Sequence, residues 1–547
     1  GKRLYGDDTY ARINVAKIKR IEILNGASSA LYGTNAIGGV INIITDDAKN
    51  AINVSSDTRY ASKGRFTQSV NIDVNTGKFG SYTSYRRQQA EGWQLNPYEE
   101  NSKTHELEET GKVASTGFYA NTVNQKFTFD ATDKLSFYAR GGYYDNKTRR
   151  PYEAYDYNIL HETFNYGIGA QYMINKGNYI TADCYADHFS SSYCFFKDNK
   201  TYNGKAGEEQ VRKRTRNHNL SIKGIFKLGN RHKLSVGTEY IVDVLKSQTD
   251  NIAKEDAYTL ALFAQDEIKL LRNLQALIGV RYIYHENFKN HATPNVALMY
   301  KPGKFNFRAS YAAGFRTPTL SELYATDIAK KNDRLTIGNL DLKPEKNNYF
   351  SLSAEYVHER FSVSVNAFYN NIRDMIDYNT IATGDKAMEQ YGHKEVRQRD
   401  NIAEAKVHGI NVSANAYLGA GFNLSGGYTH LNTQDVELEQ PIDKSIKNAY
   451  NINAQWAHSW KIYRLNINLN GRFNSKRFSK SYGYAPEYQL WDLNTRHSFN
   501  LKSVIIEPGC GMENLFDYMD DRPYNSNYAT LTPGRSFYIS LSLKFKS

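Results

Sequence analysis

The sequence predicts an all-β protein, an antiparallel transmembrane β-barrel of about 22 strands that encloses a small mixed α/β domain formed by its first residues. Three observations carry this prediction. Apolar and polar residues alternate with period two, short turns alternate with long polar stretches, and residues 1–47 differ in pattern from the rest. A strand with one apolar and one polar face suits a barrel wall between lipid and water.

The alternation is clearest in the last segment of the chain. Phe537, Ile539, Leu541, Leu543 and Phe545 fall on one face, and serine, tyrosine and lysine fall on the other. A soluble barrel would turn its apolar face inward and would need a second set of elements at this length, which the sequence does not show. The same alternation recurs at residues 135–140, 361–367 and 464–470.

The connections between these segments are of two kinds. Long polar stretches, such as Asn96–Val113, Lys147–His161, Lys197–Glu209 and Asn371–Asn401, are expected on the outer side, and tight turns are expected on the periplasmic side. A strand on each flank of every turn gives about 22 strands, a size that leaves room for a plug. The short turns are Asn75–Lys78, Ala131–Lys134, Asn175–Asn178, Gly229–His232, Leu271–Asn273, Pro302–Lys304, His358–Arg360, Gly419–Gly421, Ser459–Lys461 and one near Lys502.

Composition supports the barrel and excludes several other classes. The chain of 547 residues holds 43 Tyr and 26 Phe but 11 Pro, and its mean hydropathy is −0.64. Tyr and Phe favour strands and membrane interfaces, and Trp456 and Trp460 flank a short turn where an aromatic girdle belongs. No run of eighteen apolar residues is present, so membrane helices are excluded.

The cysteines and the charge exclude further chemistry. Cys184, Cys194 and Cys510 give neither a disulfide framework nor a metal-site spacing, and Cys184 and Cys194 could pair only if the chain reversed between them. No Ser/His/Asp set or carboxylate pair indicates an enzyme, so no catalytic residue is predicted. The net charge of +12 is scattered over loops and strands rather than gathered on one helix. It indicates contact with anionic outer-membrane lipid or ligand, and no nucleic-acid partner.

A motif near the start carries a family resemblance. Residues 21–45 read IEILNGASSALYGTNAIGGVINIIT, which closely resembles the end of the plug domain of TonB-dependent transporters. The chain has Asn25 where the family usually has Arg, which questions the usual charged contact between plug and wall at this point. A phosphate loop would need a following Lys-Ser/Thr, which is absent. The motif residues singled out are Gly26, Ser28, Ser29, Tyr32, Gly33, Gly38 and Gly39.

Three later stretches extend the resemblance over nearly the whole chain. Residues 311–324 (YAAGFRTPTLSELY) with 338–345 (GNLDLKPE) look like the family's large central loop and its flanking strands. Residues 401–410 (NIAEAKVHGI) look like a late strand start, and 513–517 (ENLFD) with 533–538 (PGRSFY) resemble the C-terminal signature. We therefore expect residues 1–47 to be the C-terminal part of a plug and residues 48–547 to be the barrel.

The resemblance implies a location, a mechanism and partners. Such a protein lies in the outer membrane of a Gram-negative bacterium and crosses it many times. It imports a nutrient when the TonB energy-coupling complex pulls an N-terminal plug segment. That segment is expected in a longer precursor, since Gly1 begins inside a domain. The resemblance implies no intrinsic cofactor. The size of the loops adds the hypothesis that they dock a surface lipoprotein.

The ligand class is the open question. The plug motif looks most like those of catecholate-siderophore and cobalamin receptors, and basic, Tyr-rich loops suit an anionic aromatic metal chelate. Haem receptors of the family often carry a His in the central loop, but residues 315–345 hold none, which leaves His285, His291 and His393 as substitutes. The candidate ligand-binding residues are Tyr152, Tyr155, Tyr157, Arg316, Tyr324, Arg472, Tyr482, Tyr484 and Arg522.

Each candidate also has a purely structural interpretation. Tyr lines many barrel lumens, solvated loop His is common, and Arg316 belongs to the family-wide motif rather than to a ligand class. Active import of a ferric siderophore is the preferred function, with cobalamin next and haem third. A passive porin would lack the plug motif, and a surface adhesin or receptor without transport stays open on sequence alone.

Overall fold

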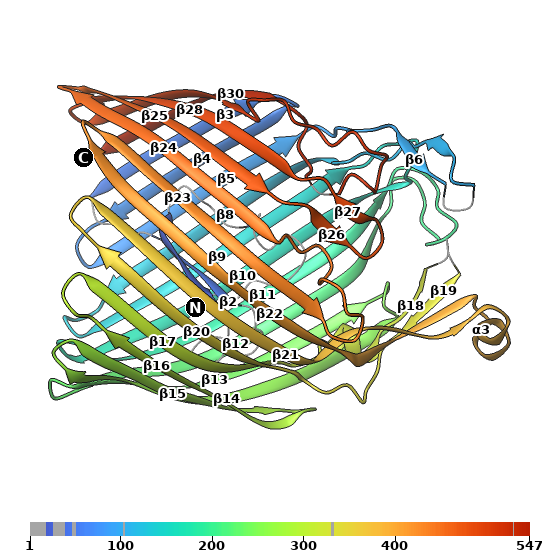
Figure 1. Ribbon diagram of the computed structural model, residues 1–547, viewed down its shortest axis with the longest axis horizontal. Helices are drawn as coiled ribbons and strands as arrows, with labels where there is room; N and C mark the ends of the chain where they lie inside the picture. Colours follow the sequence, from blue (N-terminus) through green and yellow to red (C-terminus); the bar gives the residue numbers. More distant parts are fainter. Residues whose placement is uncertain are drawn as a thin grey trace.

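The computed structural model is a closed antiparallel barrel of 22 strands, which confirms the predicted fold (Figure 1). The structure describes residues 12, 18–25, 39–45, 51–101, 104–329, 333–528 and 530–546. The last strand of the wall closes on the first, in a register from Asn53↔Lys546 to Ala61↔Tyr538. Closure leaves no free sheet edge at membrane depth, where unpaired backbone groups would find no water.

Sequence neighbours pair around the ring. The wall consists of β3 (Ile52–Ala61), β4 (Arg65–Asn75), β5 (Phe79–Ala90), β8 (Gly117–Asp130), β9 (Leu135–Arg149), β10 (Tyr157–Asn175), β11 (Asn178–Phe195), β12 (Glu209–Leu228), β13 (His232–Ser247), β14 (Ile252–Leu271), β15 (Leu274–His285), β16 (Lys289–Tyr300), β17 (Phe305–Arg316), β20 (Glu345–Val357), β21 (Phe361–Thr383), β22 (Glu395–Gly419), β23 (Phe422–Asp435), β24 (Asn448–Trp460), β25 (Tyr463–Asn474), β28 (Tyr488–Leu501), β29 (Val504–Glu513) and β30 (Ser536–Lys546).

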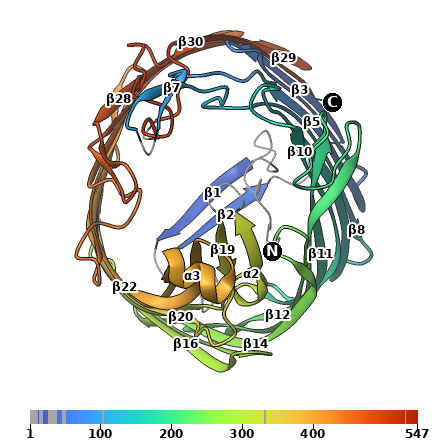
Figure 2. The same ribbon diagram turned by 90° about the vertical axis from the view of Figure 1, so that its right-hand side faces the viewer.

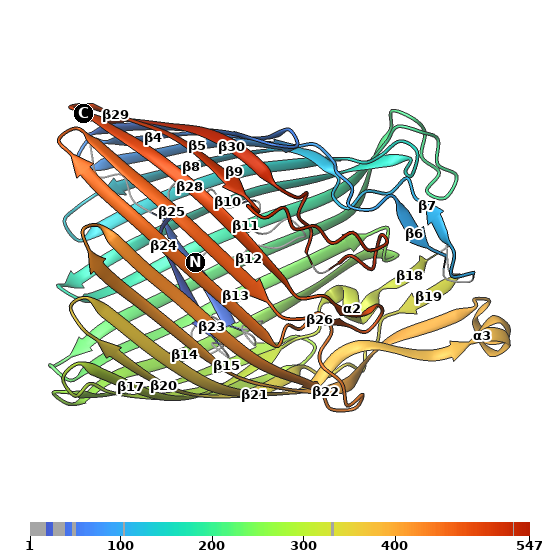
Figure 3. The same cartoon turned by 45° about the horizontal axis from the view of Figure 1, so that its top comes forward.

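The two ends of the barrel differ as the sequence predicts. All ten predicted turns join consecutive strands at one end, which we call the turn end. The opposite loop end carries the longer connections and the remaining elements (Figure 3). These are β6 (Tyr98–Glu100), β7 (Leu107–Glu109), α2 (Leu320–Tyr324), β18 (Thr326–Ala329), β19 (Arg334–Ile337), α3 (Gly384–Tyr391), β26 (Arg477–Ser479) and β27 (Gly483–Ala485).

Two of the predicted loops are largely strand. The expected loop Asn371–Asn401 is a long hairpin, because β21 and β22 stay paired to Thr383↔Glu395 and α3 closes the tip. The expected loop Lys147–His161 shrinks to residues 150–156 between β9 and β10. Beyond the membrane both faces of a strand meet water, so the apolar alternation that marks a strand in the sequence is lost there.

The outward face of the wall is apolar and the inward face is polar. On β30, Phe537 and Ile539 are 55% and 66% exposed on the outer face. Inside, Arg281 of β15 is buried and pairs with Glu239 of β13. β11 holds both Cys184 and Cys194 in one strand, and both thiols are free. Among the described residues, no helix is long and apolar enough to cross a membrane.

A two-stranded hairpin lies inside the ring (Figure 2). It joins β1 (Ile18–Asn25) to β2 (Gly39–Thr45), with Ile23 opposite Ile41. Gly39 begins β2 at φ 139°, in a region that favours glycine. The other motif residues (Gly26, Ser28, Ser29, Tyr32, Gly33 and Gly38) and the boundary predicted between residues 47 and 48 lie outside the described residues.

Candidate ligand-binding site

A contact between the N-terminal segment and the wall defines which side of β10 and β11 faces inward. Arg12 donates a hydrogen bond to Thr163 Oγ1 of β10 at 2.7 Å and pairs with Asp187 Oδ2 of β11 at 3.4 Å. The side chains of Arg12 and Asp187 are 4% and 0% exposed. Because alternate residues of a strand share a face, the odd-numbered residues of β10 and β11 point into the lumen.

Six residues nearer the loop end, the same inward faces carry tyrosines. Tyr157 of β10 stacks on Tyr193 of β11 with ring centroids 4.0 Å apart, and Tyr202 meets both rings edge-on at 5.8 and 5.2 Å. Six residues of strand put this group about 20 Å from the Arg12 contact. The tyrosines therefore lie between the plug and the outside, where an entering ligand must pass.

Two arginines complete this group, which we call the mouth cluster (Arg150, Tyr155, Tyr157, Tyr193, Tyr202 and Arg212). The Arg150 guanidinium lies 3.7 Å from the Tyr155 ring and 4.9 Å from the Tyr157 ring. The Arg212 guanidinium lies 4.9 Å from the Tyr202 ring. Burial raises the pKa of Tyr202, and Tyr157 raises it further. Tyr202 therefore stays neutral, and the two guanidinium groups give the cluster positive charge beside flat aromatic surfaces.

The connections β25–β28 and β29–β30 form a second aromatic group on the other side of the mouth. We call it the far group (Phe478, Tyr482, Tyr484, Arg522 and Tyr528). Tyr528 is its centre. Its hydroxyl shares its proton between the carbonyl oxygens of Arg477 and Gly483, at 3.0 and 2.8 Å, and its ring lies 5.8 Å from that of Tyr482. The Arg522 guanidinium lies 5.9 Å from the same ring.

Tyr524 connects the far group with the loop that follows β5. Its backbone N–H donates to Tyr98 O at 2.7 Å, and the Lys112 ammonium lies 5.7 Å from its ring. Burial raises the pKa of Tyr524, and Tyr155 and Tyr482 are among the groups that act on it electrostatically. The loop-end tyrosines of several connections therefore form one aromatic, cationic surface around the opening.

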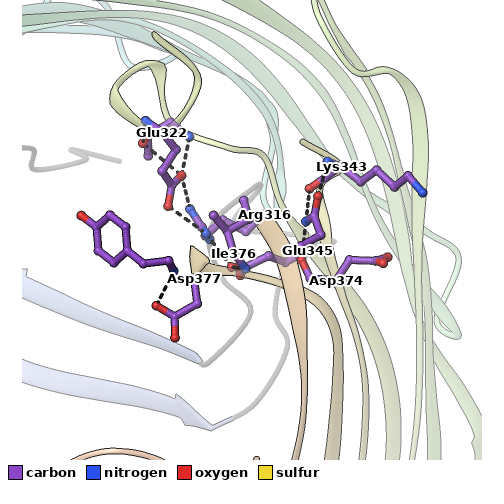
Figure 4. A network of polar contacts seen from close by, with 10 residues as sticks. Arg316, Glu322, Lys343, Glu345, Asp374, Ile376 and Asp377 are labelled. Carbon is purple, nitrogen blue, oxygen red and sulfur yellow. Dashed lines mark hydrogen bonds and ion pairs between the residues drawn. The ribbon is translucent and has the colours of Figure 1, made fainter. Parts of the chain in front are cut away.

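A separate polar network fixes the large loop between β17 and β20 (Figure 4). Arg316 pairs with Glu322 of α2 at 2.9 Å and with Glu345 of β20 at 2.5 Å, and Glu345 also accepts the Ile376 N–H at 3.0 Å. Thr319 caps α2 in a reciprocal capping box with Glu322. Burial alone would raise the pKa of Glu322, but the hydrogen bonds from Arg316 and Thr319 outweigh it and lower that pKa.

Comparison with known families decides the class of the protein. The family model described as "TonB dependent receptor-like, beta-barrel" matches residues 65–509. The model described as "TonB-dependent Receptor Plug Domain" matches residues 1–40. The chain belongs to the TonB-dependent receptors. It is therefore an outer-membrane transporter of a Gram-negative bacterium rather than an enzyme, and it works with TonB.

Solved structures share the receptor's fold at low sequence identity. A mutant of the ferric enterobactin receptor PfeA from Pseudomonas aeruginosa matches with TM-score 0.83 and 17% identity, over 99% of this chain and 86% of that one. The siderophore receptor PirA from Acinetobacter baumannii gives 0.79 and 16%, over 99% and 87%. The FrpB iron transporter from Neisseria meningitidis gives 0.75 and 14%, over 97% and 88%.

The structure distributes the receptor's sequence-predicted residues over five places. Tyr155 and Tyr157 lie in the mouth cluster. Tyr482 and Arg522 lie in the far group, where Tyr484 packs 5.3 Å from Phe478 and Asp520 holds Arg522 through two hydrogen bonds. Tyr152 is exposed on the rim, 5.4 Å from Phe196, and Arg472 is exposed on β25 in register with Asn451 and Leu490. Arg316 and Tyr324 belong to the central-loop network, where Tyr324 packs against the apolar cluster of Leu323, Leu342 and Ile376.

Sequence reasoning missed Arg150, Tyr193, Tyr202, Arg212 and Tyr528. Tyr193 could have been found from alternation, because it lies on the same face of β11 as Asp187 and near that strand's loop end. The two arginines could not, because alternation does not show which rings they meet: Arg150 lies over Tyr155 of its own loop and over Tyr157, and Arg212 lies over Tyr193 of the neighbouring strand and over Tyr202.

The three histidines proposed as haem ligands are engaged elsewhere in the receptor. His285 accepts the Asn287 N–H at 3.1 Å and is 6% exposed. His291 stacks on Phe315 with centroids 4.8 Å apart, and His393 pairs with Asp333 at 2.9 Å. Within the described part of the chain, no three His, Cys, Asp or Glu residues are grouped to hold a metal ion.

Proposed function

We propose that this receptor imports a ferric siderophore with aromatic, anionic chelating groups, in a TonB-dependent manner. The mouth cluster is the observation that carries the proposal. Arg150 and Arg212 supply fixed positive charge beside stacked tyrosine rings, a combination that attracts a flat anionic ligand by stacking and charge-assisted hydrogen bonds.

Two further observations support this ligand class over the alternatives. Solved receptors of similar fold are named for ferric enterobactin, for a siderophore or for iron. Haem is less favoured, because His285, His291 and His393 are held by hydrogen bonds, stacking or an ion pair rather than facing one another across the lumen. Cobalamin has no feature of the described residues in its favour.

Binding to the purified receptor tests the proposal directly. Quenching of intrinsic fluorescence is measured with four probes: ferric enterobactin, a ferric trihydroxamate, cyanocobalamin and haemin. Saturable binding is expected for ferric enterobactin. Arg150→Gln with Arg212→Gln should weaken it at least tenfold, because a hydrogen bond to a charged group contributes about 1.5–3 kcal/mol.

The matched control removes the same charge from the other end of the lumen. Arg464→Gln with Arg496→Gln alters inward positions of β25 and β28 and should change the affinity less than twofold. Binding of cyanocobalamin or haemin without binding of either ferric chelate would overturn the proposal. In cells, a deletion strain should lose growth on the ferric catecholate as sole iron source.

A further inference from the structure

The outward face of the wall carries a group of basic side chains on three adjacent strands. Arg214, Arg216 and His218 occupy alternate positions of β12, and all three are exposed. His188 of β11 is the register partner of Arg216, and Lys246 of β13 is the partner of Arg214. The imidazoles of His188 and His218 lie 5.4 Å apart. We call these five residues the outer basic patch.

The charges of this patch are not balanced by nearby acids. Arg214 and Lys246 are directly opposite, an arrangement of like charges that destabilises a sheet. On the same outward face, Glu162 of β10 accepts the Tyr143 hydroxyl at 2.8 Å, and Asp256 of β14 pairs with Lys254 at 3.2 Å. Neither Arg214 nor Lys246 forms an ion pair with any residue that the structure describes. The patch therefore lacks a counter-anion.

An apolar groove of about 520 Å³ lies beside the patch on the same outward face. The small side chains of Ala139, Ala170 and Ala182 form its floor between larger neighbours. The larger side chains around it are Phe127, Phe129, Phe137, Ile168 and Leu220. This lining has the apolar character that suits a hydrocarbon chain.

The groove and the patch share strands. Leu220 lines the groove, and His218 and Arg216 follow on the same face two and four residues toward the loop end, about 7 and 13 Å away. The outward positions Leu220–Leu228 span nine residues, the length of a strand that crosses the hydrocarbon layer. The patch therefore lies at headgroup level on the loop side, which is the outer side in this class of barrel.

We propose that the outer basic patch and the groove together bind a phosphate-bearing lipid of the outer leaflet. The guanidinium groups of Arg214 and Arg216 hold headgroup phosphate, the two imidazoles and Lys246 add donors, and one acyl chain lies in the groove. Arginine forks match phosphate oxygens in geometry and charge. A free phosphate ion would leave the adjoining groove without an occupant, so the lipid is the better match.

Native mass spectrometry of the full receptor in detergent, with diphosphoryl lipid A as the probe, tests this proposal. The wild-type receptor should bind the lipid saturably, and Arg214→Gln with Arg216→Gln should lower the bound fraction at least tenfold at a fixed lipid concentration. The matched control, Arg87→Gln with Lys406→Gln, removes the same charge from outward positions of β5 and β22 and should change it less than twofold. Equal lipid binding by both double variants would overturn the proposal that the outer basic patch holds the headgroup phosphate.

A second pair of variants tests the groove without changing charge. Ala182→Leu fills the floor and should lower lipid binding at least fivefold, whereas Ala414→Leu, at an exposed outward position of β22, should leave it unchanged. Undiminished binding by Ala182→Leu would overturn the acyl-chain assignment. Displacement of the lipid by millimolar inorganic phosphate would show a free-phosphate site and overturn the proposal. None of these measurements uses the iron chelate, so they are independent of the import function.

Discussion

Replacing Arg316 should loosen the large central loop without unfolding the barrel. Arg316 holds two carboxylates that come from different elements, Glu322 of α2 and Glu345 of β20. Arg316→Gln removes the charge and leaves both carboxylates in a partly desolvated place. The barrel itself depends on inter-strand hydrogen bonds that do not involve these side chains, so the effect should stay local.

The exposure of the three side chains sets the magnitude. They are 21%, 14% and 10% exposed, between a buried pair that costs roughly 3–5 kcal/mol to break and an exposed pair worth about 0–1 kcal/mol. A value of about 1–1.5 kcal/mol for each of the two pairs, just above the exposed limit, gives about 2–3 kcal/mol for local opening. Every 1.4 kcal/mol is a factor of about ten, so opening should become about 30 to 150 times more frequent.

Hydrogen exchange at single amides measures this opening. The suitable probes are the N–H groups of Leu323, Gly338 and Asn339, which donate to Thr319 O, Ala325 O and Glu322 O within the loop. Their protection should fall by the stated factor in Arg316→Gln. Protection within threefold of wild type at all three amides would refute the argument.

Two controls separate the local effect from others. Glu322→Gln breaks one of the two pairs and should give about half the free-energy change. Arg373→Gln removes an arginine that is 64% exposed and lies 3.9 Å from Glu404, and it should change protection less than twofold. Equal effects from Arg316→Gln and Arg373→Gln would mean that net charge, not the network, protects the loop.

Two other contacts lead to predictions. Arg12→Gln leaves the fully buried Asp187 carboxylate without its cation, so the N-terminal segment should dock less firmly against the wall. The leak of vancomycin into cells should therefore rise. Arg20→Gln, which changes an exposed arginine, should leave the leak unchanged. The folded-state pKa of Glu322 lies below its ordinary value of 4.5, so its contribution is present above about pH 4.5 and is lost as pH falls through the lowered pKa. Protection of the Leu323 amide, corrected for intrinsic exchange, should be flat from pH 7 to 5 and fall below pH 4.5, and Glu322→Gln should abolish that change.

The barrel could be predicted from sequence because its wall obeys a simple physical rule. Lipid on one side and water on the other impose period-two alternation, so Phe537 and Ile539 identify their strand and its face without any tertiary information. The turns could be predicted for the same reason, since each interrupts the alternation. The rule stops at the membrane surface, so the sequence predicts a loop beyond Asn371 where the structure has the paired strands β21 and β22.

The candidate site could be predicted only in part, because it depends on the pairing of distant strands and loops. Tyr157 could be named from composition and loop position. Its contact with Tyr193 follows only from the β10–β11 pairing: Tyr193 is opposite Ile159, two residues along the same face from Tyr157. The Arg150 guanidinium lies over the Tyr157 ring, and the Arg212 guanidinium lies over the Tyr193 ring. Sequence alone gives the kinds of side chain available and not which of them meet.

The register of β11 keeps the two proposed surfaces apart. Asp187 faces the lumen and holds Arg12, while His188, the next residue, faces outward in the basic patch. A shift by one residue would exchange the two faces and place Asp187 against lipid. A bulge interrupts the residue-by-residue pairing of β11 with β12 between Ser191 and Ser192. It helps to fix the register of the pairs between this point and the turn end. Ligand recognition inside and lipid binding outside can therefore be altered independently on the same strands, provided that the bulge is left intact.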